Sequence, residues 1–171
     1  MTATRRIDRV TADDYVVDVD TLDEPELRAK RNEAVELETE YSYVRRLAQG
    51  RIEILKAEQD RRRRGGSLQE LIDRLPDILA DSTPTRPAPA RARVVEMFAP
   101  DKLSGYQRGL EVLVEDDALM RLPDLSENEI DERLELLRSL EAEVSSVRAQ
   151  LHVVIDVLTT AITRRFGETA P

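Results

Sequence analysis

Residues 37–55 read LETEYSYVRRLAQGRIEIL, and residues 140–158 read LEAEVSSVRAQLHVVIDVL. In each stretch apolar residues recur at steps of three and four, which is the spacing of a helix that buries one narrow stripe against a partner helix. The sequence therefore predicts an all-α protein in which two long amphipathic helices pack as a coiled coil. The apolar stripes consist of Leu37, Tyr41, Val44, Ala48, Ile52 and Leu55, and of Leu140, Val144, Val147, Leu151, Val154 and Leu158.

Local signals set the expected ends of these two helices. Asp23 with Glu26, and Ser126 with Glu129, have the spacing of an N-terminal capping box, in which side chains satisfy the first backbone N–H groups. Arginines followed by glycine mark the other ends, because cations suit the last turn and glycine ends a helix readily. The predicted long helices cover residues 23–64 and 126–166.

The rest of the chain has weaker signals. Ser67 with Glu70 opens a short apolar helix that we expect over residues 67–80. The run STPTRPAPAR begins a Pro-rich, partly disordered linker and irregular region over residues 82–125. Residues 1–22 are predicted to form an N-terminal arm, and the β-prone run at residues 15–17 would suit pairing at a sheet edge.

The composition of the 171 residues excludes several classes of protein. A net charge of -9 argues against direct DNA binding and suits a basic partner. The absence of Cys excludes disulfides and thiolate sites, and no apolar run approaches the roughly 20 residues of a membrane span. With a single His as well, little is available to hold a metal or activate water. We therefore expect a cytoplasmic protein that is not an enzyme and has no catalytic residues, metal site or cofactor.

A polar pattern accompanies both apolar stripes at one fixed offset, because 141 minus 38 is 103. Both copies read E-x3-S-x2-R-x3-(Q or H)-x3-(E or D). Steps of four, three, four and four keep the five side chains within an arc of roughly 80° on a helix, so each helix presents one polar stripe. Motif 1 is Glu38, Ser42, Arg45, Gln49 and Glu53, and motif 2 is Glu141, Ser145, Arg148, His152 and Asp156.

The residue types in the two motifs indicate a ligand that has both anionic groups and hydrogen-bond donors. The planar guanidinium groups of Arg45 and Arg148 suit phosphate oxygens or the O6/N7 edge of guanine. The carboxylates can accept hydrogen bonds from the ring N–H and exocyclic amine of a guanine. If the helices pack antiparallel, the motifs would face each other about a pseudo-two-fold axis. The long intervening segment also permits a parallel arrangement.

A simpler interpretation is that these residues are ordinary helix-surface residues. Their spacing of three and four is also that of routine ion pairs within one helix. Under this interpretation the chain is a coiled-coil adaptor or oligomerisation module without a nucleotide ligand.

The doubled motif resembles the cyclic-di-GMP signature E-x3-S-x2-R-x3-Q-x3-D of the RsiG family, actinobacterial anti-sigma factors that sequester the sporulation sigma factor WhiG. This chain departs from the signature at Glu53, where the family has Asp, and at His152, where it has Gln. The resemblance implies an antiparallel helical hairpin whose ten motif residues bind cyclic-di-GMP as a dimer. It also implies that the loaded protein sequesters a WhiG-type sigma factor and blocks transcription of sporulation genes.

Overall fold

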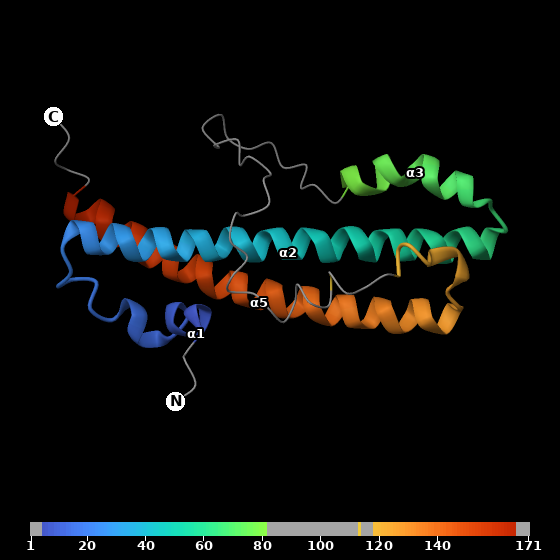
Figure 1. Ribbon diagram of the computed structural model, residues 1–171. Coiled ribbons are helices and arrows are strands. Elements are labelled where there is room, and N and C mark those ends of the chain that lie inside the picture. Colours follow the sequence, from blue (N-terminus) through green and yellow to red (C-terminus); the bar gives the residue numbers. More distant parts are fainter. Residues whose placement is uncertain (1–4, 82–112, 114–117, 167–171) are drawn as a thin grey trace. The chain divides into compact units, whose positions relative to one another are not determined.

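The computed structural model describes residues 5–81, 113 and 118–166, and within these ranges every regular element is helical (Figure 1). The predicted all-α class is confirmed, because two long helices, α2 and α5, pack together. The predicted linker lies outside the described residues over positions 82–112 and 114–117. The elements in chain order are α1 (Arg6–Val10), the 3-10 helix η1 (Asp13–Val16), α2 (Glu24–Arg64), α3 (Leu68–Asp81), the 3-10 helix η2 (Leu122–Asp124) and α5 (Glu127–Phe166).

Capping boxes start both long helices, as the sequence predicts. The Glu26 backbone N–H donates to Asp23 Oδ1 over 2.8 Å, and the Asp23 N–H donates back to Glu26 Oε2 over 3.0 Å. At α5 the Ser126 N–H donates to Glu129 Oε2 over 2.7 Å, and the Glu129 N–H donates to Ser126 Oγ over 3.2 Å. These reciprocal bonds satisfy N–H groups that have no partner within the helix.

The turn between α2 and α3 depends on one glycine. Gly65 has a φ of +70°, a conformation that side chains with a Cβ rarely adopt. The Gly65 and Gly66 N–H groups donate to the carbonyls of Arg62 and Arg61 over 3.1 and 3.0 Å. These bonds close the last turn of α2 before α3 begins.

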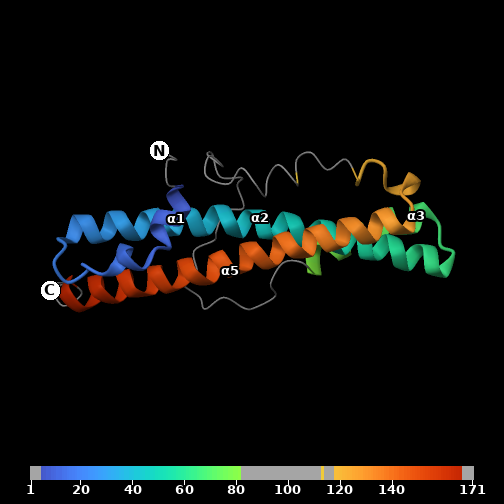
Figure 2. The same ribbon diagram turned by 90° about the horizontal axis from the view of Figure 1, so that it is seen from below.

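The chain divides into two compact units, and each unit contains part of both long helices. Among the described residues, unit 1 consists of 5–42 and 143–166, and unit 2 consists of 43–81, 113 and 118–142. In both views the part of α2 that belongs to each unit runs beside the part of α5 in the same unit (Figures 1 and 2).

Unit 1 is an antiparallel packing of the first part of α2 on the last part of α5. Arg31 Nε donates to Thr159 Oγ1 over 2.9 Å, and Arg148 Nη2 donates to Glu38 Oε1 over 2.8 Å. Residue numbers therefore rise along α2 where they fall along the adjacent part of α5, so the two helices are antiparallel here. The core of unit 1 consists of Ile7, Val10, Tyr15, Leu27, Ala34, Leu37, Tyr41, Val144, Leu151, Val154, Leu158 and Ala161.

Unit 2 repeats the antiparallel packing with the other parts of the two helices. Gln59 Nε2 donates to Asp131 Oδ1 over 2.6 Å, and Arg45 Nε donates to Glu141 Oε1 over 2.8 Å.

Over both units, all twelve residues of the two predicted apolar stripes are buried except Val147, which is half-buried. The core of unit 2 consists of Val44, Ala48, Ile52, Leu55, Leu71, Leu113, Ala118, Leu122, Leu125, Ile130, Leu134, Leu137 and Leu140.

The prediction of an edge-pairing segment near the N-terminus is wrong. Residues 13–16 form the 3-10 helix η1, and no strand occurs anywhere in the described part of the chain. Tyr15 decides the local structure, because its buried hydroxyl donates to Glu33 Oε2 over 2.8 Å and Lys30 lies over its ring, 4.5 Å from the centroid. Tertiary contacts with α2 thus override the β propensity of this run.

Candidate functional site

The Glu38 cluster of unit 1 consists of Glu38, Ser42, Arg148 and His152. Glu38 Oε1 accepts from Arg148 Nε over 3.1 Å, from Arg148 Nη2 over 2.8 Å and from Ser42 Oγ over 2.6 Å. His152 Nε2 lies 3.2 Å from the same oxygen. One carboxylate of motif 1 therefore contacts the arginine and the imidazole of motif 2.

The Glu141 cluster of unit 2 consists of Glu141, Arg45 and Gln49. Glu141 Oε1 accepts from Arg45 Nε over 2.8 Å and from Gln49 Nε2 over 3.3 Å. Here the carboxylate belongs to motif 2, and the arginine and the amide belong to motif 1. The side chains of Arg45 and Glu141 are 33% and 26% exposed, so both can be reached from solvent.

The two clusters are equivalent under the offset of 103 residues. Adding 103 to Glu38, Arg45 and Gln49 gives Glu141, Arg148 and His152. In each cluster a glutamate from one motif accepts from the arginine and the next polar residue of the other motif. The Arg–Glu pairs therefore join α2 to α5, and they are not the pairs within one helix that the simpler interpretation expects.

The surroundings of Glu38 keep it charged. Burial by itself would raise the pKa of this carboxyl group, because a low-dielectric environment disfavours the charged form. Hydrogen bonds from Ser42, Arg148 and His152 outweigh that effect, and the pKa of Glu38 lies below its ordinary value. The cluster thus holds a carboxylate against a cationic guanidinium group near neutral pH.

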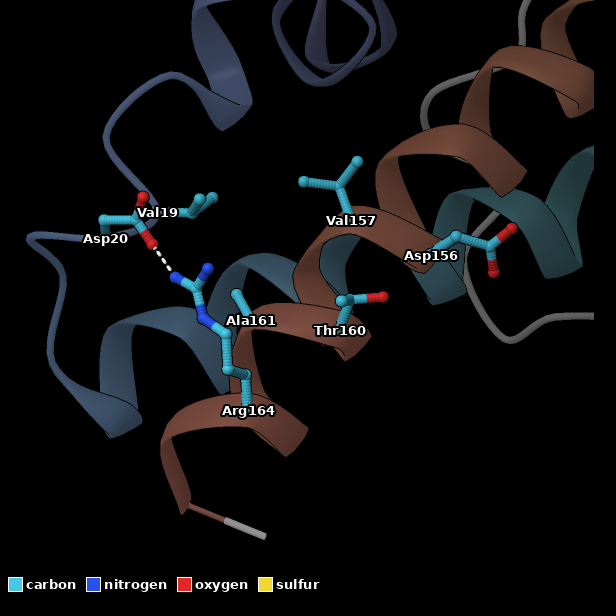
Figure 3. Close-up of a pocket in the computed structure, with 7 residues that line it drawn as sticks. All are labelled: Val19, Asp20, Asp156, Val157, Thr160, Ala161 and Arg164. Atoms are coloured by element: carbon cyan, nitrogen blue, oxygen red, sulfur yellow. Dashed lines mark hydrogen bonds and ion pairs between the residues drawn. The ribbon is translucent and has the colours of Figure 1, made fainter.

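Glu53 and Asp156 lie outside these two clusters. Glu53 is 43% exposed and accepts from Lys56 Nζ over 2.9 Å within α2. Ser145 is half-buried on α5. Asp156 is exposed and borders a depression formed by α5 and residues 19 and 20 (Figure 3). The structure therefore brings Glu38 together with Arg148 and His152, along with Ser42. It also brings Glu141 together with Arg45 and Gln49.

Two arginines outside the motifs obey the same offset, and the sequence reasoning treated them only as charges at helix ends. Arg62 donates through Nη2 and Nη1 to the carbonyls of Leu122 and Leu125 over 2.9 and 2.6 Å. Arg165 Nη1 donates to the carbonyls of Val19 and Leu22 over 3.2 and 2.7 Å. Arg165 lies 103 residues after Arg62, and Leu122 and Leu125 lie 103 residues after Val19 and Leu22. Extending the offset of 103 beyond the two motifs would therefore have identified these contacts as equivalent.

The chemistry available at the clusters is recognition rather than bond making. Guanidinium groups can donate to phosphate or to a guanine edge, and carboxylates can accept from a guanine. Within the described ranges no three His, Asp or Glu side chains converge as a metal site would require. No helix in this part of the chain is long and apolar enough to cross a membrane.

The family model described as RsiG-like matches residues 13–79, a segment that runs from η1 through α2 into α3 and includes all of motif 1. Over these residues the chain is similar to the RsiG-like family. The RsiG-like family is a family of regulatory anti-sigma factors and not of enzymes. Motif 2 lies beyond the RsiG-like match, and its relation to motif 1 rests on the offset and on the equivalent contacts. No curated protein matches the chain.

Proposed function

We propose that this chain is a cytoplasmic, cyclic-di-GMP-dependent anti-sigma factor. The two motifs bind a cyclic-di-GMP dimer, and in that state the protein sequesters a WhiG-type sigma factor and blocks transcription of sporulation genes. The RsiG-like match over residues 13–79 supports an anti-sigma factor and a sigma factor partner in general.

The observation that carries the proposal is the equivalence of the Glu38 and Glu141 clusters. Each cluster holds one arginine and one glutamate from opposite motifs at 2.8 Å, with side chains between 21% and 33% exposed. Cyclic-di-GMP has two equivalent phosphates and two equivalent guanines. Two equivalent sets of donors and acceptors suit such a ligand better than a ligand with one recognition point.

Arginine and glutamate have different expected roles at the ligand. Arg148 uses Nε and Nη2 on Glu38, and a guanidinium group has five N–H donors, so capacity remains for a phosphate oxygen or the guanine O6/N7 edge. The glutamates accept from the guanine ring N–H and amine. Because the Arg–Glu pairs already order these side chains, less rotamer freedom is lost when the nucleotide binds.

The proposed control of transcription follows from linkage. A nucleotide can stabilise the sigma-bound state only by binding that state more tightly than the free one. Sigma in turn must tighten nucleotide binding by the same factor. A fall in nucleotide concentration then releases sigma, and transcription begins.

Isothermal titration of the chain with cyclic-di-GMP, with and without a WhiG-type sigma factor, tests the proposal. Arg45→Ala and Arg148→Ala should each weaken nucleotide binding at least about tenfold, since each removes a charge-assisted contact. Arg138→Ala is the matched control, because Arg138 is an exposed arginine of α5 outside the motif. Circular dichroism should show the same helix content in all variants.

The adaptor interpretation has one observation in its favour, because the arginines and glutamates of the motifs already pair with each other. It predicts no heat of binding with cyclic-di-GMP in either titration and equal behaviour of the three arginine variants. That outcome would refute the nucleotide-dependent function and leave a coiled-coil module.

A further inference from the structure

The outer face of α5 in unit 1 carries a depression of about 340 Å³ that the motif clusters do not use. Its floor is mainly apolar, and an ion pair between Arg164 and Asp20 spans one side (Figure 3). This volume is at the lower end of the range for binding sites in proteins. The residues around it are Val19, Asp20, Val157, Thr160, Ala161 and Arg164, with Asp156 at its edge.

An exposed apolar side chain extends this face toward the N-terminus of α5. Val153 is 63% exposed, and it precedes Val157 by four residues and Asp156 by three, so the three side chains share one side of the helix. Ala149, four residues earlier, is also exposed. The helix thus presents an apolar strip that leads into the depression, and we call this surface the α5 groove.

Unit 2 shows what covers the equivalent surface of α2. Subtracting 103 from Thr160 and Arg164 gives Ala57 and Arg61, which line a smaller depression of about 50 Å³. There α3 lies against the helix, and its Leu71 is only 4% exposed (Figure 1). An amphipathic helix that inserts a leucine therefore occupies this position in one half of the repeat.

The charges at the two positions are different. In unit 2 the surface of α2 carries Arg61 and Arg64, and α3 brings Glu70 and Arg74 to the same depression. In unit 1 the groove is bordered by Asp156 and Asp20, with Arg164 already paired to Asp20. By charge complementarity, a helix that fits the α5 groove carries a lysine or arginine where α3 carries a glutamate.

The geometry points to the α5 groove as the docking site for a basic amphipathic helix of the protein partner. The guest inserts a leucine-like side chain beside Val153 and Val157 and places a cation near Asp156. This assignment rests on the proposed function in one respect, since it takes a sigma factor as the partner.

The position of the groove explains how the nucleotide and the partner would influence each other. Asp156 is the last residue of motif 2 and also borders the groove. His152 of the Glu38 cluster directly precedes Val153 on the same turn of α5. A guest helix in the groove therefore contacts the same turns of α5 as the nucleotide, which is the shared element that linkage between two sites requires.

Binding of a WhiG-type sigma factor to the full chain at saturating cyclic-di-GMP tests the groove. Val153→Glu and Thr160→Glu should each weaken sigma binding at least about tenfold, because both place a carboxylate in an apolar contact. Leu136→Glu is the matched control, since Leu136 is 49% exposed on α5 outside the groove, and it should leave sigma affinity within twofold. Titration with cyclic-di-GMP alone, with helix content checked by circular dichroism, should give unchanged values for all three variants.

A photo-reactive phenylalanine analogue at position 153 gives a second measurement that does not depend on a loss of affinity. It should crosslink to a sigma segment that is helical, amphipathic and basic. Sigma binding by Val153→Glu and Thr160→Glu as tight as by the unmodified chain, together with crosslinks to other segments, would overturn the groove but leave the proposed function intact. If the unmodified chain binds no sigma at all, the proposed function fails and the groove assignment fails with it.

Discussion

The Glu38 and Glu141 clusters have the same plan but different surroundings. Glu38 accepts hydrogen bonds from Arg148 and Ser42 and lies 3.2 Å from His152 Nε2, whereas Glu141 accepts hydrogen bonds from Arg45 and Gln49. Arg148 is 22% exposed, against 33% for Arg45. Both copies of the sequence pattern therefore form the same kind of pair between the two helices, and the local environment makes the Glu38 copy more buried than the other.

The ends of the two long helices differ more strongly than the clusters. Arg62 of α2 donates to two backbone carbonyls of the segment that precedes α5. Arg165 of α5 donates to two backbone carbonyls of the segment that precedes α2. Arg62 also pairs with Glu58, whose side chain is fully buried, and the position equivalent to Glu58 is Ala161. Unit 2 thus has a buried ionic group at this position, whereas unit 1 has an alanine that lines the α5 groove.

The largest expected effect is therefore at Arg62. Arg62→Ala should lower the free energy of unfolding by about 2 kcal/mol, because it leaves two carbonyls and a buried carboxylate with fewer partners. Arg165→Ala is the matched change on the exposed side and should have a clearly smaller effect. Urea denaturation at pH 7 measures both values, and equal losses would contradict the difference between the two ends.

The next largest effect is expected from removal of the motif arginines, which should destabilise the two clusters to different extents. Arg148→Ala should lower the free energy of unfolding by about 1–2 kcal/mol, because Glu38 is a largely buried carboxylate that would lose its cation. Arg45→Ala should lower it less, since its pair is more exposed. Thermal unfolding of the two variants compares them directly. A larger loss of unfolding free energy in Arg45→Ala than in Arg148→Ala would show that the burial of a cluster does not determine its contribution to stability.

The Glu38 cluster should also show a specific dependence of stability on pH. The pKa of Glu38 is lowered in the folded chain, so its contribution is present above the ordinary value of about 4.5 and is lost as the pH falls through the lowered pKa. Glu38→Gln should therefore cost about 1 kcal/mol at pH 7, and this cost should shrink as the pH falls below about 4.5 and through the lowered pKa. Glu53→Gln, at an exposed position, is the control for a general charge effect. A cost for Glu38→Gln that does not change with pH would argue against an ionic role.

The smallest expected effect comes from making the two clusters alike. His152→Gln gives motif 2 the residue type of Gln49 and keeps a donor within reach of Glu38. We expect nucleotide affinity within about twofold and a change in stability below about 0.5 kcal/mol, because His152 is 57% exposed. His152→Ala removes the donor and should weaken nucleotide binding more than His152→Gln does. Equal binding by both variants would mean that the side chain at position 152 is not part of the nucleotide contact.

Sequence periodicity predicted the helical architecture well because burial and capping are local signals. The spacing of Leu37 to Leu55 and of Leu140 to Leu158 identified two stripes that together are buried at eleven of twelve positions, with Val147 half-buried. The run at residues 15–17 was misread because its helical form depends on Glu33 and Lys30 of α2, which are distant in sequence.

The sequence by itself determined that two copies of one polar motif lie on two long helices, because side-chain spacing on a helix follows directly from its period of 3.6 residues. Only the tertiary structure decided that each glutamate pairs with the arginine of the opposite motif, since an antiparallel and a parallel packing bury the same stripe. It also decided that Arg62 and Arg165 donate to equivalent carbonyls, and that α3 covers part of α2 while no described helix lies in the equivalent position on α5. These outcomes depend on which surfaces meet across distant parts of the chain, and no local period specifies that.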